Sequence, residues 1–334
     1  MPNQLTVTTH DRAEQHRADL RRDVLLIAAL TALAVGSIAA YLFTGLTGNI
    51  DYALSRRITS VAALVIVAVA IGVSTVAFQT MTANRLLTPS IMGFDSLYLL
   101  LQTVVIFALG VTGFAVIDAL GQFWLEVAAM LVFSVLLYGW LLSRNTRVTR
   151  LLLIGVVFGM LFRGISTFLQ RMLDPDAFAV LQTRFFASFT DVPKELVLPA
   201  AALTVLGLLI AWFDRRRYDV MSLGVPIATN LGINPAMLRA RTLGVVALLV
   251  SVSTALVGPV MFFGLIVAQL AYRAVRLSRH ELLMPVASLV GVIALVGGQT
   301  LVQRVFGLDV ALSMIIEFLG GLLFIALILR KKPL

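Results

Sequence analysis

The sequence predicts an all-α, polytopic integral membrane protein with about ten transmembrane helices. Its 334 residues are 60% hydrophobic and only 13% charged, whereas soluble domains average about 25% charged residues. Apolar stretches of about 20 residues, the length that a helix needs to cross a bilayer, recur from one end of the chain to the other. These observations exclude an ordinary soluble domain.

The apolar stretches predict the spanning helices in order. They lie near 24–43, 60–80, 94–114, 123–142, 150–170, 195–213, 241–257, 259–276, 282–303 and 310–329. Residues 1–23 are polar and include Arg12 and Arg17. Because the first apolar stretch exceeds the core of about 7–15 residues in a signal peptide, we expect 1–23 to remain as a cytoplasmic N-terminal tail. The rest, 24–331, then forms a single transmembrane domain.

The boundary at Gly258-Pro259 decides the number of spans. A continuous helix over 241–276 would leave nine spans and place the basic residues of 330–332 outside. Pro259 removes a backbone donor and clashes with the preceding turn, which favours a break. With ten spans and the amino terminus inside, most of the 26 lysines and arginines lie in inner segments, as the positive-inside rule expects. Both termini are therefore predicted to be cytoplasmic.

The sequence lacks the residue types and motifs of common enzyme active sites. There is no cysteine, the only histidines are His10, His16 and His280, and neither HExxH nor GxSxG occurs. No lysine follows a glycine, as the phosphate-binding P-loop requires. We expect no catalytic site, no metal site and no cofactor. The net charge of +9 is spread between apolar spans, which indicates membrane topology and no nucleic-acid partner.

The longest inner loop, "DRRRYDVMSLGVPIATNLGINPAMLRARTLG" at 214–244, has the pattern of a docking element. Leu231, Ile233 and Met237 alternate with polar residues, and Gly232 and Pro235 divide the segment into short helices. A short amphipathic element on the cytoplasmic side fits a groove of another protein. A surface loop anchored by its arginines is the alternative.

A second unusual stretch, "TANRLLTPSIMGFDSLY" at 82–98, interrupts two apolar runs. Non-helical backbone at membrane depth is tolerated only where protein or a water-filled cavity satisfies it. The stretch is therefore a candidate gate beside a pathway. An ordinary loop with Thr88 and Asp95 as helix caps is the alternative.

Arg163 lies inside the fifth predicted span. Ser166, Thr167 and Gln170 follow it at i+3, i+4 and i+7, on the same face of a helix. A charged residue inside a span usually faces a cavity or a partner, so this face is a candidate lining for an anionic substrate. Snorkelling of Arg163 to the outer interface is the alternative, and Glu317 in the last span is expected to pair with a neighbouring helix.

Three later segments carry a family resemblance: "LGINPAMLRARTLG", "GPVMFFGLIVAQLAYRAV" at 258–275, and "QTLVQRVFGLDVALSMIIEFLGGLLFIALILRK" at 299–331. They resemble the FecCD-type permeases of iron-siderophore and cobalamin ABC importers, the type II importers, over 24–331. The resemblance implies a permease of the bacterial cytoplasmic (inner) membrane, embedded in the lipid bilayer. It also implies a second permease subunit, two ATP-binding-cassette ATPase subunits and an extracytoplasmic binding protein as partners.

The resemblance also implies residue roles. The coupling segment, 214–241, would dock on the ATPase through Leu231, Gly232, Asn234, Met237 and Arg239. The cytoplasmic gate would contain Asn84, Leu86, Leu87 and Thr149. Independently of the resemblance, the helix face described above places Arg163, Thr167 and Gln170 along the translocation path. Arginines in "SRRITS" and "VQRVFG", namely Arg56, Arg57 and Arg304, would dock the binding protein, with the choice between Arg56 and Arg57 open.

The chain departs from the family pattern at Arg85, which replaces a proline, and at Ala268-Gln269, which replaces Pro-His. The sequences of 82–103 and 258–273 are most similar to those of permeases for petrobactin and anguibactin, which predicts import of a ferric siderophore of the catecholate type. A cobalamin or haem importer permease, an ion- or proton-coupled secondary transporter using Glu126 or Glu317, and a scaffold protein are the alternatives. The second permease is expected to be a distinct chain, with a homodimer as the other possibility.

Overall fold

The computed structural model describes residues 9–45, 49–143, 148–306 and 312–329. The regular structure in these ranges is entirely helical. Within the described ranges, 9 helices are long and apolar enough to cross a membrane, and one further apolar helix is shorter. The predicted all-α membrane fold with about ten helices is thereby confirmed.

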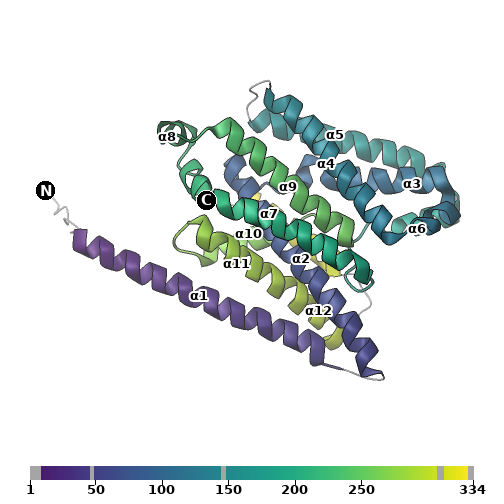
Figure 1. The fold of residues 1–334 in the computed structure, drawn as a ribbon, viewed down its shortest axis with the longest axis horizontal. Coiled ribbons are helices and arrows are strands. Elements are labelled where there is room, and N and C mark those ends of the chain that lie inside the picture. The colour runs from purple at the N-terminus through teal and green to yellow at the C-terminus, as the bar shows by residue number, and fades with distance from the viewer. Residues whose placement is uncertain (1–8, 46–48, 144–147, 307–311, 330–334) are drawn as a thin grey trace.

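Figure 1 shows the helices in their order along the chain. They are α1 (Thr9–Phe43), α2 (Ile50–Thr82), η1 (Pro89–Met92), α3 (Phe94–Val116), α4 (Ala119–Ser143), α5 (Val148–Gln170), α6 (Pro175–Gln182), α7 (Lys194–Met221), α8 (Val225–Asn230), α9 (Pro235–Val257), α10 (Phe263–Ala274), α11 (His280–Val292), η2 (Ile293–Gly297), α12 (Gly298–Thr300), η3 (Leu301–Val305) and α13 (Leu312–Leu329). Segments α11 to η3 form one continuous helical span, in which η2 and η3 are π-helical.

Helices α2 and α9 lie at the centre of the bundle. They pack against each other and against α7, and α2 also packs against α11. The approach of α2 and α11 is close because glycine lies at the contact. A Cβ atom at Gly291 would lie 3.0 Å from the carbonyl oxygen of Ala68, so a larger residue would push the two helices apart.

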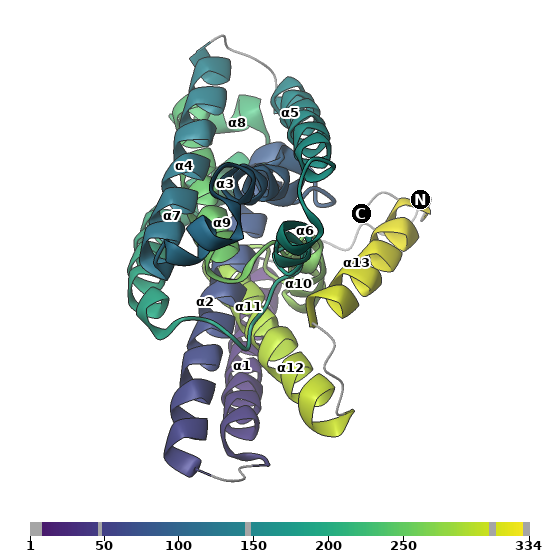
Figure 2. The ribbon, with the colours of Figure 1, turned by 90° about the vertical axis from the view of Figure 1, so that its right-hand side faces the viewer.

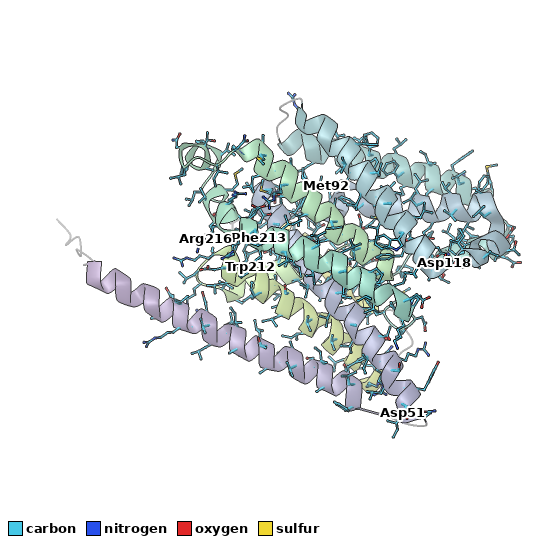
Figure 3. The ribbon with its side chains drawn as sticks, viewed as in Figure 1. Asp51, Met92, Asp118, Trp212, Phe213 and Arg216 are labelled. Carbon is cyan, nitrogen blue, oxygen red and sulfur yellow. The ribbon has the colours of Figure 1, made fainter. Side chains whose placement is uncertain are left out.

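Figure 3 marks the two ends of the bundle. Arg216 lies toward the end that carries α8, whereas Asp51 and Asp118 lie toward the opposite end.

The predicted break after Gly258 separates α9 from α10. Gly258 has a φ of 101°, a conformation that favours glycine, and α10 starts only at Phe263. With 12 residues α10 is about 18 Å long, shorter than the hydrocarbon core of about 30 Å. Residues 258–262 therefore lie outside any helix, and neighbouring segments must supply hydrogen-bond partners for their backbone. At the end of α9, the backbone N–H of Ser188 donates to the carbonyl of Val257 at 2.8 Å.

Helix α1 begins at Thr9, within the stretch expected to be a separate tail. Its polar part contacts the loop between α10 and α11. The buried carboxylate of Asp23 accepts from the backbone N–H groups of Arg276 and Leu277 at 3.2 and 3.0 Å, and Asp19 pairs with Arg276 at 2.9 Å. These contacts fix the polar end of α1 against the same end of the bundle.

Helix α13 lies at one side of the bundle, as Figure 2 shows, and packs against α10. Its remaining surface exposes Phe318, Leu319 and Leu322. In a membrane protein, an exposed apolar helix face is a contact for lipid or for another subunit.

Candidate functional site

The predicted gate lies in a non-helical segment between α2 and η1. Helix α2 ends at Thr82, and Ala83 is the only non-glycine residue with positive φ in the described part of the chain. Side chains of two helices hold the carbonyl groups that follow: Gln79 of α2 donates to the carbonyls of Arg85 and Leu87 at 2.8 and 3.1 Å. Gln269 of α10 donates to the carbonyl of Arg85 at 2.6 Å. Protein groups thus satisfy this non-helical backbone.

The capped-loop alternative does not describe this segment. Thr88 precedes η1 but its side chain makes no capping hydrogen bond, and Gly93, not Asp95, occupies the N-cap of α3. Gly93 instead allows close contact with α5, since a Cβ atom there would lie 3.0 Å from the Cα of Gly159.

A cavity of about 950 Å³ borders the gate segment. Asn84 and Leu86 line it, together with Tyr272 of α10. The guanidinium of Arg85 stacks on the Tyr272 ring with its carbon 4.5 Å from the ring centre, a cation–π contact. Leu87 is half-buried against the core and does not line this cavity. The backbone of Thr149 lies in the first turn of α5, and its side chain lies outside the described residues.

The coupling segment has a buried base and an exposed apolar surface. Asp214 is fully buried and pairs with Arg217 and Arg241 at 2.7 and 2.9 Å, which ties the end of α7 to the start of α9. Beyond this base, the side chains of Leu231 and Met237 are exposed by 61% and 68%. Exposed apolar side chains on a rigid base are the arrangement that a docking element needs.

The other predicted coupling residues shape this segment. Gly232 has a φ of 82°, and the side chain of Asn234 caps α9 by accepting from the N–H groups of Ala236 and Met237, both at 3.1 Å. Arg239 is half-buried and lines the same cavity as the gate segment. The cavity therefore lies between the two predicted functional segments.

The predicted path residues divide between two environments. Arg163 and Thr167 line an open hollow of about 520 Å³ on α5, together with Arg171, which the sequence analysis did not identify. Gln170 instead donates to the hydroxyl of Ser166 at 2.8 Å, and buried Ser166 bonds with Thr103 of α3 at 2.7 Å. Only Arg163 and Thr167 of the predicted trio are thus on the open face.

The three predicted docking arginines differ in environment. Arg57 has an exposed fraction of only 8% and donates to the carbonyls of Leu42, Thr44 and Gly45, each at 2.8 Å. Arg57 therefore satisfies unpaired carbonyls at the end of α1, and of the two candidate arginines it is the less accessible. Arg56 is exposed and pairs with Asp191, and exposed Arg304 lies 3.5 Å from the carbonyl of Gly45.

Two buried polar clusters join neighbouring helices. Glu126 of α4, named from the sequence only for the secondary-transporter alternative, accepts from Gln102 of α3 at 2.6 Å. Glu317 of α13 makes no ion pair among the described residues. The second cluster joins His280 to Asp219 and Thr80, each at 2.7 Å. Sequence alone placed His280 in a loop, and nothing near it in the chain indicated these partners.

Comparison with known proteins identifies the family. Residues 24–330 match the FecCD transport family. The chain belongs to this family. It is 44% identical over 312 residues to the petrobactin import system permease protein YclO of Bacillus subtilis (strain 168), covering 93% of this chain and 99% of that relative. It is 35% identical over 282 residues to the petrobactin import system permease protein FatC of Bacillus anthracis, covering 84% and 80% of the two chains.

A solved structure supports the fold. A chain described as an inward-facing conformation of a metal-chelate type ABC transporter has a TM-score of 0.80 and 22% identity, and the match covers 92% of this chain and 99% of that one. The predicted family, the type II importer permease fold and the prediction of a permease subunit of an ABC importer, not an enzyme, are confirmed. The secondary-transporter and scaffold alternatives are set aside for the same reason.

Proposed function

We propose that this permease carries a ferric siderophore of the catecholate class, with petrobactin the first candidate, from the outer side of the bacterial cytoplasmic membrane into the cytoplasm. The observation that carries the proposal is the 44% identity to a petrobactin import permease over 93% of this chain. Distant relatives in the same family import other cargo, including one named for vitamin B12 at 24% identity. The much higher identity to the petrobactin permeases favours a siderophore over cobalamin or haem.

The charge on the open face of α5 supports an anionic cargo. Arg163, Arg171 and Thr167 line this hollow, and ferric catecholate complexes are anionic. A cationic side chain inside a span is costly to insert unless it faces water or a partner charge. Attraction between these arginines and the cargo is the role that this face fits best.

A second permease subunit would complete the path. The hollow at Arg163 is lined only by residues of α5 and its end, so a closed pathway needs another surface opposite it. The exposed apolar face of α13 offers a contact area for the same partner. We assign this place to a related but distinct permease, with a second copy of this chain as the alternative. Mass measurement of the purified assembly distinguishes a heterodimer from a homodimer.

Energy would come from two ATP-binding-cassette ATPase subunits docked on the coupling segment, with both termini of the permease on the same cytoplasmic side. Leu231 and Met237 supply the exposed apolar contacts, and Gly232, Asn234 and Arg239 shape the segment. The gate segment with Asn84, Leu86 and Leu87, joined by Thr149, would then close the inner end of the path.

Cargo would be delivered by an extracytoplasmic siderophore-binding protein at the opposite end. Arg56 and Arg304 are exposed there, and complementary charges give a transient partner steering and orientation. Arg57 is only 8% exposed, which supports Arg56 as the docking residue of the pair.

The decisive experiment is uptake of a panel of radioactive iron siderophores by cells with and without this subunit. Petrobactin and other ferric catecholates should enter only when the subunit is present, while hydroxamate siderophores, cobalamin and haem serve as competing cargo. Dependence on the subunit for cobalamin or haem, and not for any ferric siderophore, would refute the assignment.

A further inference from the structure

His280 joins the ends of two helices that are far apart in the chain. It is the first residue of α11 and only 2% exposed. Its backbone N–H and its Nδ1 both contact the Oδ1 atom of Asp219 on α7, at 2.8 and 2.7 Å. Its Nε2 lies 2.7 Å from the hydroxyl of Thr80 on α2. One buried ring therefore bridges α7 and α2.

Counting protons indicates how tightly the bridge is held. Nδ1 donates, because an ionised carboxylate only accepts. The single proton of the Thr80 hydroxyl has two possible acceptors, Nε2 and the carbonyl of Val76 at 2.9 Å. With the ring proton on Nδ1, Nε2 accepts from the Thr80 hydroxyl, so each ring nitrogen makes one hydrogen bond.

Each end of the bridge adjoins one of the proposed functional segments. Asp219 lies in the last turn of α7, within the coupling segment and shortly before Gly224 and α8. Thr80 lies in the last turn of α2, next to Gln79, whose side chain holds the gate carbonyls of Arg85 and Leu87. Two hydrogen bonds through His280 thus connect the end of α7 to the helical turn that supports the gate.

We propose that His280 is a positioning residue that transmits movement of the coupling segment to the gate segment. The inference rests on the proposed roles of those two segments. Because the ring is buried and bonded on both sides, the ends of α7 and α2 cannot move apart without leaving buried polar groups unpaired. They therefore move together, and the bridge converts ATPase-driven movement into opening or closing of the gate.

Two substitutions separate the halves of the bridge. In His280→Asn the side-chain amide can still reach Asp219 but not Thr80. In His280→Gln the longer amide can reach Thr80 but no longer donates to Asp219 as Nδ1 does. Thr80→Val removes the hydroxyl at nearly constant volume, and Thr80→Ser keeps it. Ser288→Ala is the matched control, since the Ser288 hydroxyl bonds only to the carbonyl of Met284 within α11.

The experiment uses the complete transporter, with its ATPase, partner permease and binding protein, in proteoliposomes. It measures ferric petrobactin moved per ATP hydrolysed, and thiol labelling of an Asn84→Cys probe in this cysteine-free chain with and without nucleotide. We expect His280→Asn, His280→Gln and Thr80→Val to assemble and hydrolyse ATP, but to move about fivefold less cargo per ATP, the effect of losing about 1 kcal/mol of hydrogen bonding. Nucleotide-dependent labelling should weaken in parallel, while Thr80→Ser and Ser288→Ala behave as wild type.

The outcomes separate this inference from a purely structural role. If the variants only lower the yield or melting temperature, and the assembled transporters keep the wild-type ratio and labelling, His280 is a packing residue and the inference is overturned. If wild type moves no ferric siderophore, the proposed cargo fails. The labelling comparison still decides the bridge in that case: identical nucleotide dependence in wild type and in His280→Asn overturns it, and loss in the variant supports it.

Discussion

Aspartate at Met237 or Leu231 should separate docking on the ATPase from folding of the permease. The two side chains are exposed by 68% and 61%, so the substitution should change the stability of the isolated permease by no more than about 0.5 kcal/mol. In the assembled transporter the same site would lose about 1.5–3 kcal/mol of apolar burial. It would also bury an unpaired charge, which costs several kcal/mol more.

Together these effects predict a loss of at least about 3 kcal/mol, or about 100-fold in the dissociation constant of the ATPase. Titration of labelled ATPase against the permease in nanodiscs measures it, and a thermal melt of the permease alone checks the fold. Asn230→Asp is the matched control, because it adds the same charge to an exposed position of the same segment without removing an apolar side chain. If Met237→Asp and Leu231→Asp both bind the ATPase with unchanged affinity, the docking role of the coupling segment is refuted.

Three further predictions follow from individual contacts. Arg57→Met should lower the stability of the permease by about 2–3 kcal/mol in a denaturation assay, because it leaves the carbonyls at the end of α1 without donors, whereas Arg56→Met should have little effect. The double change Arg56→Glu and Arg304→Glu should weaken binding-protein affinity, most at low ionic strength; equal affinities at low salt would leave only an anchoring role. Cysteines at Asn84 and Leu86 should change in thiol accessibility between nucleotide states, and constant labelling in every state would exclude a gate there.

The sequence predicted the spanning helices because each must bury about 20 apolar residues, and it predicted the break at Gly258 because proline cannot continue a helix. It predicted helix ends less well. Helix α2 begins at Ile50 and α7 continues to Met221, since polar residues extend both helices beyond the apolar stretches. Composition defines the part of a helix inside hydrocarbon, whereas hydrogen bonding continues past that limit.

Burial of individual polar residues could not be read from the sequence. Arg56 and Arg57 are neighbours on a helix and point about 100° apart, so only the position of α1 decides which of them is buried. His280 lies 61 residues from Asp219 and 200 residues from Thr80 along the chain, and no local pattern connects the three. Contacts of this kind become visible only once the helices are placed in space.

The contact between α1 and the loop after α10 has a consequence for biosynthesis. The carboxylate of Asp23 lies 253 residues before the backbone N–H of Arg276 that it accepts from. At about 5–20 residues per second, a ribosome needs roughly 13–50 seconds to make that length of chain. Throughout this interval the carboxylate of Asp23 lacks the partners that it has in the folded protein. The polar end of α1 is therefore fixed only after α10 and the loop behind it have been made.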